Sequence, residues 1–224
     1  MVHSRILEID GKRTTLDFGH EGVLYRQSFI MYDKQTDSKW NHATGLAMAG
    51  NLAGRRLEIL PSRVMRWESW KRMYPRTRVL AREGRFDFMG TYVGADHYGA
   101  LGLSVGLGPG AKLYPFEALM SEKVVNDRVE PLDVVVVIDP VGKEAAAFVR
   151  SVDGKPLTFK PAAAKSGTLL MRDDQTGTLW ERLSGRATSG KLAGREILPT
   201  VSVPWLMERW RQIYRDGIVY RPHR

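Results

Sequence analysis

The chain contains the stretch DKQTDSKW at residues 33–40 and repeats it in modified form as DDQTGTLW at residues 173–180. Apolar runs flank both copies, and the aspartate and threonine that the copies share can hydrogen-bond to nearby backbone groups. Each copy therefore predicts a turn between two antiparallel strands. The tryptophan that ends each copy begins the return strand. Because the stretch occurs twice at equivalent positions, we interpret it as a structural turn rather than as an acidic reactive site.

The repetition extends on both sides of these stretches. At a constant offset, the identical pairs are Met31 and Met171, Asp33 and Asp173, Gln35 and Gln175, Thr36 and Thr176, Trp40 and Trp180, Gly45 and Gly185, Ala47 and Ala187, and Gly50 and Gly190. Further matches join residues 9–12 to 152–155, 52–55 to 192–195, Leu60-Pro61 to Leu198-Pro199, Trp70 to Trp210 and Tyr74 to Tyr214. Each copy therefore predicts two hairpins, a glycine bend, a strand and a helix, in that order.

The fold class predicted by this pattern is mainly β, a β-rich α+β protein. It has two similar β modules from an internal repeat, each closed by a short helix. We expect the helices at residues 63–74 and 204–214. The modules are expected at residues 1–82 and 111–224, with a glycine-rich connecting loop at residues 83–110. All six tryptophans lie inside the two copies, so we expect them to pack two equivalent cores.

The chain carries a formal net charge of +9, which favours an acidic partner. Basic residues are densest between residues 55 and 85, around the first expected helix. The candidate partner-binding residues are Arg63, Arg66, Lys71, Arg72, Arg76 and Arg78. Their partner is an acidic protein surface, an anionic membrane surface or a nucleic acid, and a purely solubilising surface is the plain alternative.

Several classes of reactive site are absent from the sequence. The chain has no cysteine, which excludes disulfides, zinc–thiolate sites, iron–sulfur clusters and thiol nucleophiles. Its five histidines lie far apart, without the spacing of metal ligands. Residues 102–106, GLSVG, match the letters of a nucleophile elbow around Ser104, but the strand and helix that an elbow needs are not predicted there. The sequence thus leans against an enzyme and predicts no catalytic residue, metal or cofactor.

The sequence also bears on membranes and on location. No run of about 18 apolar residues occurs, so no membrane-spanning helix is predicted. The first ten residues lack the apolar core of a secretory signal. We therefore expect the protein in the cytoplasm, or bound peripherally to the cytoplasmic face of a membrane.

The repeated residues also carry a family resemblance. They include Leu24-Tyr25, Met31-Tyr32-Asp33, Thr36, Ser38, Trp40, Thr44-Gly45, Gly50, Leu52-Ala53-Gly54 and Leu60-Pro61. The chain resembles an uncharacterised bacterial and archaeal domain-of-unknown-function family with the duplicated motif M-Y-D-x-x-T-x-S-x-W followed by L-A-G, and the resemblance implies no activity. Such relatives often carry a Cys-Pro-x-x-Cys-like segment before the first copy and a Cys-Pro before the second, whereas this chain has Asp139-Pro140 at the second place. The resemblance therefore implies no metal or thiol chemistry here.

We expect the function of a non-catalytic binding or scaffold protein. It would be an extrinsic accessory subunit that docks through its basic surface on an acidic protein or a membrane-bound complex. The alternative is an enzyme or small-ligand binder with its site between the repeats, at the glycine-rich loop with Asp96, His97 and Tyr98. Nucleic-acid binding is a weaker alternative, because basic and aromatic residues do not alternate in a known motif.

Overall fold

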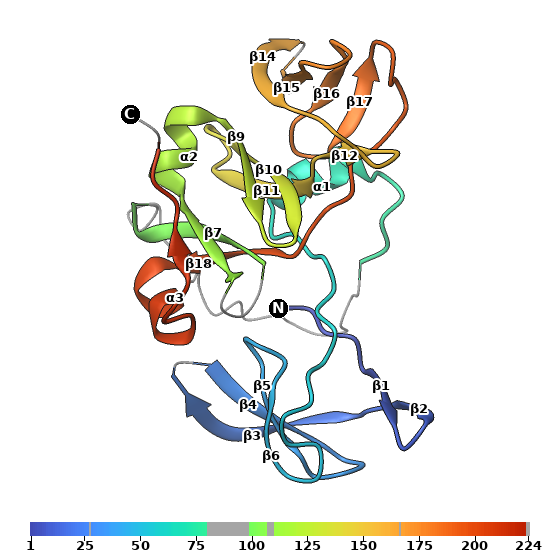
Figure 1. Cartoon of the computed structure of the whole chain (residues 1–224), viewed down its shortest axis with the longest axis vertical. Helices are drawn as coiled ribbons and strands as arrows, with labels where there is room; N and C mark the ends of the chain where they lie inside the picture. Colours follow the sequence, from blue (N-terminus) through green and yellow to red (C-terminus); the bar gives the residue numbers. More distant parts are fainter. Residues whose placement is uncertain (27, 80–98, 107–109, 166, 223–224) are drawn as a thin grey trace.

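The computed structural model describes residues 1–26, 28–79, 99–106, 110–165 and 167–222. Strands dominate the described residues, which form only three helices. Figure 1 shows the first β module at one end of the long axis, the second at the other end, and a central body between them. The mainly β class predicted from the sequence is confirmed.

The first module consists of a hairpin and a four-stranded antiparallel sheet. Its strands are β1 (Ile6–Ile9), β2 (Lys12–Thr15), β3 (Phe18–Tyr25), β4 (Ser28–Asp33), β5 (Lys39–Asn41) and β6 (Ala47–Ala49). The sheet has the order β3-β4-β5-β6, and Met31 pairs with Trp40. Asp10 and Gly11 both have positive φ, so the hairpin turn is of the type I′ that Asp-Gly predicts.

The second module repeats the first. Its strands are β12 (Ser151–Val152), β13 (Lys155–Pro156), β14 (Phe159–Lys165), β15 (Thr168–Asp173), β16 (Leu179–Glu181) and β17 (Arg186–Ser189). The sheet has the order β14-β15-β16-β17, and Met171 pairs with Trp180. The same strand order and the same register in both sheets confirm the internal duplication.

A buried aspartate fixes the repeated turn in each module. Asp33 Oδ1 accepts the backbone N–H of Thr36 at 2.6 Å, and Asp33 Oδ2 accepts the indole N–H of Trp40 at 2.9 Å. Asp173 accepts the equivalent two hydrogen bonds in the second copy, also at 2.6 and 2.9 Å. Both aspartates are 0% exposed. The structural role predicted for this stretch is confirmed.

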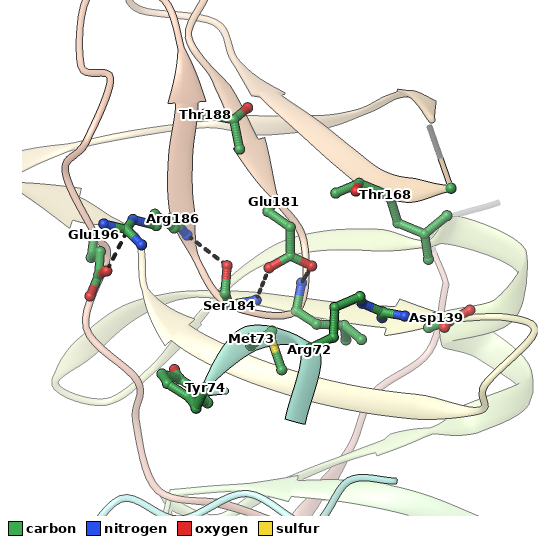
Figure 2. Close-up of a pocket in the computed structure, with 13 residues that line it drawn as sticks. Arg72, Met73, Tyr74, Asp139, Thr168, Glu181, Ser184, Arg186, Thr188 and Glu196 are labelled. Atoms are coloured by element: carbon green, nitrogen blue, oxygen red, sulfur yellow. Dashed lines mark hydrogen bonds and ion pairs between the residues drawn. The ribbon is translucent and has the colours of Figure 1, made fainter. Parts of the chain in front are cut away.

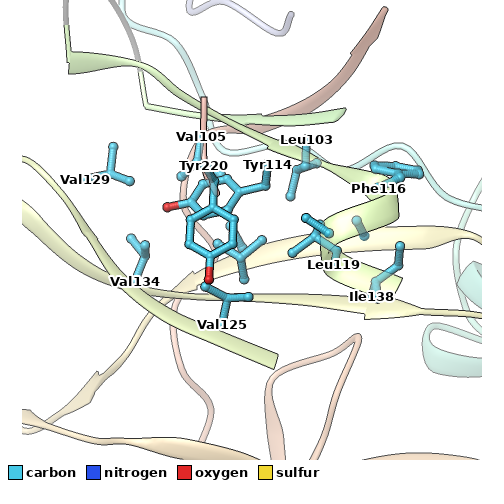
Figure 3. Packing of buried hydrophobic residues seen from close by; sticks show 14 of the residues in the cluster. Leu103, Val105, Tyr114, Phe116, Leu119, Val125, Val129, Val134, Ile138 and Tyr220 are labelled. Atoms are coloured by element: carbon cyan, nitrogen blue, oxygen red, sulfur yellow. The ribbon is translucent and has the colours of Figure 1, made fainter. Parts of the chain in front are cut away.

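Two further sheets and one helix make up the central body. Its elements are β7 (Leu101–Val105), β8 (Lys112–Pro115), α2 (Phe116–Glu122), β9 (Val124–Val129), β10 (Leu132–Asp139), β11 (Glu144–Val149), β18 (Ser202–Leu206) and β19 (Ile218–Val219). The sheet orders are β11-β10-β9 and β18-β7-β8-β19. Figure 3 shows the apolar core of this body, where Tyr114 stacks on Tyr220 with ring centroids 5.1 Å apart.

Part of the range predicted as a connecting loop is a strand. Leu101–Val105 forms β7, which is buried and pairs with both β18 and β8. A Cβ on Gly102 would lie 2.9 Å from the side chain of Leu113, so this glycine allows close packing rather than a turn. The many glycines in this range predicted a loop where the structure has strand β7. Residues 83–98 and 107–109 lie outside the described residues, and the module boundaries stay a prediction.

Both predicted helices are shorter than expected. They are α1 (Trp67–Met73) and α3 (Met207–Ile213). Before α3, residues 202–206 pair with β7 as strand β18. Before α1, Arg66 is extended and donates its backbone N–H to Glu144 Oε1 at 2.5 Å. In both places, contacts with the central body replace the first turns of the expected helix.

Each of these helices lies close to the module of the other repeat. Arg63, just before α1, donates Nη1–H to the carbonyl of Leu183 in the second module at 2.6 Å. Tyr214, just after α3, donates its hydroxyl to the carbonyl of Ala43 in the first module at 3.5 Å. Ala43 and Leu183 are equivalent positions of the repeat. In Figure 1, α1 lies beside the second module although it follows the first in the chain. The helix of each repeat thus contacts the module of the other repeat, which links both modules to the central body.

Candidate functional site

The basic residues predicted to bind a partner lie on α1 and its flanks. The exposed members of this set are Arg66, Lys71, Arg72, Arg76 and Arg78. Arg66 pairs with Glu68 at 3.3 Å, but both side chains are exposed and such a pair contributes little. The other four cations have no acidic side chain within ion-pair distance among the residues that the structure describes. Lys71, Arg76 and Arg78 are therefore free to face an external anion, whereas Arg72 also lines a cavity that it shares with Asp139.

Arg63 differs from the rest of this set. Its guanidinium donates to the carbonyl of Leu183 and to the hydroxyl of Tyr74, at 2.6 and 2.8 Å. The same group lies 5.8 Å from the ring centroid of Phe148, within the range of a cation–π contact. These contacts hold the segment before α1 against the second module, so Arg63 is not part of the docking surface.

Apolar side chains lie among the exposed cations. Trp67 is 52% exposed and Val64 is 63% exposed, whereas Trp40, Trp180 and Trp210 are fully buried. The prediction that all tryptophans pack the cores is therefore wrong for Trp67. An open depression beside it is lined by Arg63, Met65, Trp67 and Trp70. We define the α1 surface as Val64, Arg66, Trp67, Lys71, Arg72, Arg76 and Arg78.

The repeat itself contains a signal that Trp67 is special. At the repeat offset that joins Trp70 to Trp210, Trp67 corresponds to Met207 and Arg66 to Leu206. Met207 and Leu206 are partly buried, whereas Trp67 and Arg66 are exposed. The shared architecture therefore does not require an indole or a guanidinium at these two positions.

A cavity of about 320 Å³ separates the end of α1 from the second module. Figure 2 shows its polar side chains, with Arg72 pointing from α1 toward Asp139. Glu181 is engaged locally, because its carboxylate accepts the backbone N–H groups of Leu183 and Ser184 at 3.2 and 2.7 Å. These hydrogen bonds stabilise the loop after β16. We therefore interpret the cavity as part of the interface between α1 and the second module rather than as a reactive centre.

Residues 1–92 and 101–223 match the model of a family described as "Protein of unknown function (DUF3179)". The chain belongs to this family. No curated protein and no solved structure matches it. The family resemblance seen in the repeated motif is thereby confirmed for this DUF3179 protein.

The structure shows where other sequence motifs of this DUF3179 protein lie. Ser104 lies inside β7, 5% exposed, and accepts the indole N–H of Trp210 at 2.8 Å, so its role is structural. Asp96, His97 and Tyr98 lie outside the described residues. Within the described part of the chain, no three histidine or acidic side chains form a group that could hold a metal ion. None of the helices there has the length and apolar character needed to cross a bilayer.

We expect the stability of the protein to depend on pH because of His42, whose ring stacks on Phe29 in the first module. Burial, followed by the nearby amino terminus and His3, lowers the pKa of His42 to about 4. Unfolded histidine has a pKa of about 6.5, so between these values only the unfolded chain takes up the proton. We expect the free energy of unfolding to fall as pH is lowered through this window, and to fall less steeply in His42→Phe. Urea unfolding at several pH values measures both slopes.

The control for this prediction is His20→Phe. His20 and His42 both stack on Phe29, with ring centroids 5.2 and 4.1 Å apart, but His20 is exposed. This variant should keep the slope of the unmodified protein. A His42→Phe profile as steep as that of the unmodified protein would contradict the prediction.

Proposed function

We propose that this DUF3179 protein is a non-catalytic binding protein that docks through the α1 surface on an acidic surface of another protein. The half-exposed indole of Trp67 carries the proposal; it lies among exposed cations of which, in the described part of the chain, Arg66 alone has an acidic partner, the exposed Glu68. Tryptophan and arginine are enriched among the residues that dominate binding energy in protein interfaces. A surface that serves only solubility would display the cations without exposing an indole beside Val64.

A protein partner fits the α1 surface better than a nucleic acid or a bare membrane. The open depression that Trp67 and Trp70 line offers apolar surface to a side chain of a partner. Proteins that bind single-stranded nucleic acid through aromatic groups present a series of them along a basic groove. Here α1 has seven residues, and the large apolar side chains of residues 64–79 that are more than half exposed are Val64, Trp67 and Val79, a single aromatic ring among them.

The accessory role follows from the same features. Asp33, Asp173 and Glu181 accept hydrogen bonds within turns of the modules. The exposed tryptophan and the exposed cations lie on α1 and its flanks. A subunit of this kind contributes a surface rather than a reaction. We therefore propose an extrinsic subunit of a larger assembly, with a membrane-bound complex as one form that the acidic partner can take.

The test compares two charge reversals of equal size. Arg66→Glu/Lys71→Glu/Arg72→Glu changes the α1 surface, and Lys12→Glu/Arg13→Glu/Lys34→Glu changes exposed cations of the first module by the same charge. The acidic protein that co-purifies from the source cell at low salt is purified, and its affinity for each variant is measured at several salt concentrations. We expect the first variant to bind at least about tenfold more weakly and the second within about twofold of the unmodified protein.

Trp67→Ala completes this test, because it removes the indole without changing the charge. It should weaken binding by about tenfold or more if the indole is an anchor. Equal losses in the two charge-reversal variants would mean that only net charge matters, and the proposal would then be wrong. Unchanged binding in all three variants would have the same consequence.

A further inference from the structure

The two repeats build the same helix but flank it differently. Helices α1 and α3 begin and end at equivalent residues of the repeat. The residues before them also share one conformation, with φ and ψ of −64° and 140° at Arg66 and of −68° and 123° at Leu206. Strands β18 and β19 flank α3, whereas the equivalent residues 62–66 and 78–79 pair with no strand in the described part of the chain. The first repeat thus presents two segments without the strands that receive their counterparts.

In the second repeat, the hairpin of β7 and β8 receives these segments. β18 pairs antiparallel with β7, and β19 pairs parallel with β8. The hairpin also covers the apolar face of α3, because Ala111 and Leu113 pack against Trp210 and Tyr214. The second repeat therefore shows what kind of element fits a helix flanked in this way.

The corresponding apolar face of the first repeat is more exposed. Tyr74 is 38% exposed, whereas its equivalent Tyr214 is 6% exposed. Val79 is 64% exposed, whereas its equivalent Val219 is partly buried. Among the described residues, no hairpin covers α1 as β7 and β8 cover α3.

Alternate residues of β18 direct their backbone groups toward β7. In an extended strand, the N–H and C=O groups of successive residues point to opposite edges. Pro204 has no N–H, and the carbonyl of Val201 accepts the N–H of Gly106 at the end of β7. Val203 and Trp205, two and four residues after Val201, therefore point their backbone groups to the same edge.

The equivalent edge of residues 62–66 is unpaired. Arg66 donates its backbone N–H to Glu144 of the central body, so the backbone groups of Arg63 and Met65 point to the opposite edge. Arg63 and Met65 correspond to Val203 and Trp205 of β18, and in the described part of the chain no hydrogen bond reaches their backbone groups. An unpaired edge of this kind accepts a strand from another chain.

The charges around α1 differ from those around α3. The first repeat has Arg66, Lys71, Arg72, Arg76 and Arg78 where the second has Leu206, Arg211, Gln212, Asp216 and Ile218. Five cations thus stand where the segment covered by β7 and β8 has one cation and one acid. Strands that complement the first repeat are therefore acidic, unlike β8, which carries Lys112.

We propose that the docking partner adds an acidic β-hairpin to the first repeat, an inference that rests on the proposed function. One strand pairs antiparallel with residues 62–66, through the backbone groups of Arg63 and Met65. The other strand pairs parallel with residues 78–79 and packs a leucine on α1, as Leu113 packs on α3. Acidic side chains of the hairpin pair with the exposed cations of the α1 surface.

The experiment titrates the whole protein, labelled with ¹⁵N, with the cyclic peptide Gly-Glu-Ser-Val-Gly-Asn-Gly-Ala-Glu-Leu-Tyr-Glu-D-Pro-Gly. The peptide copies residues 102–106 and 111–115, with glutamate in place of Leu103, Lys112 and Pro115 and with two-residue turns at both ends. Hydrogen exchange of the Met65 amide should slow at least about tenfold on binding, because this N–H gains a strand partner. Absence of binding, or binding that leaves this amide unprotected, overturns the proposal.

Two control peptides test the apolar contact and the charge. Serine in place of the peptide's leucine should weaken binding at least about tenfold, because α1 stays uncovered. Glutamine in place of its three glutamates should weaken binding at least about fivefold at low salt. Binding of either control as tight as that of the acidic hairpin overturns the proposal.

Proline variants test which edge is used, with affinities measured by calorimetry. Met65→Pro removes an N–H from the unpaired edge and should weaken binding at least about tenfold, whereas Met65→Ala keeps it and should stay within about threefold. Val64→Pro removes an N–H from the other edge, where the second repeat has Pro204, and should also stay within about threefold. Equal losses in the two proline variants overturn the pairing. Dimerisation of the unmodified protein that Met65→Pro abolishes would identify a second copy as the occupant and overturn the proposal as well.

This test fails separately from that of the proposed function. If the hairpin does not bind but the purified partner still depends on Arg66, Trp67 and Lys71, docking stands and only strand addition is refuted. If the hairpin binds but reversing the charge of the α1 surface leaves partner binding unchanged, the edge stands as a site and docking through α1 is refuted.

Discussion

Replacing Asp173 by alanine is expected to lower the free energy of unfolding by about 3–5 kcal/mol, since it leaves the buried indole N–H of Trp180 and two part-buried donors of Thr176 without their acceptor. The carboxylate is 0% exposed and accepts the backbone N–H and hydroxyl of Thr176 together with the indole N–H of Trp180. The indole N–H of Trp180 cannot reach water without opening the core that Trp180 fills, whereas Thr176 is partly exposed. Urea unfolding followed by tryptophan fluorescence measures the loss.

Two controls separate the buried acceptor from simple loss of charge. Asp174→Ala removes the neighbouring exposed pair with Lys160 and should cost less than about 1 kcal/mol. Asp173→Asn keeps the volume and one acceptor, but its amide group meets the donors at Oδ2, so its cost should be intermediate. A loss for Asp173→Ala no larger than that for Asp174→Ala would show that the turn does not depend on this carboxylate.

The same substitution in the first module is expected to act more locally. The core around Trp40 draws only on first-module residues such as Leu16 and Leu57, whereas the core around Trp180 includes Val135 and Phe148 of the central sheet. Asp33→Ala should therefore increase hydrogen exchange mainly in the first module. The equivalent aspartates thus stabilise two modules, of which only the second shares its core with the central body.

The duplicated modules could be predicted because their signals are local. Asp10-Gly11 requires two positive φ values, and Asp33 bonds within its own turn, so a few neighbouring residues suffice to specify the conformation. The central body gives no such signal. Strand β7 contains Gly102, which sequence patterns associate with loops, and its strand identity depends on pairing with β18, about a hundred residues away.

The candidate site was only half predictable for a related reason. The cations on α1 follow directly from the sequence, but the exposure of Trp67 depends on where α1 lies. Its spacing with Val64 and Trp70 is that of a buried helix face, and the extended segment at Arg66 removes the first turn of that face. Glu144 belongs to no sequence motif, and only the tertiary fold brings it to the backbone N–H of Arg66.

Replacing Trp210 by alanine is expected to cost about 3–5 kcal/mol, as for other large buried aromatic side chains. Trp210 is 0% exposed, donates its indole N–H to Ser104 of β7 and packs against Tyr214, with ring centroids 5.3 Å apart. It therefore holds α3 on the central body, and α3 in turn places Tyr214 against Ala43 of the first module. Removing the indole should increase amide hydrogen exchange in α3 and β7. It should also weaken the contact between Tyr214 and the first module.

The repeat offers a matched control in Trp70→Ala. Trp70 is the equivalent residue, donates its indole N–H to Thr77 and packs on Tyr74 with centroids 4.5 Å apart, but it is only partly buried. Its removal should cost about 1–2 kcal/mol, because less apolar surface returns to water. Equal losses for the two variants would show that burial on the central body does not set the contribution of α3. The coupling of the first module through Tyr214 would then have to arise from other contacts.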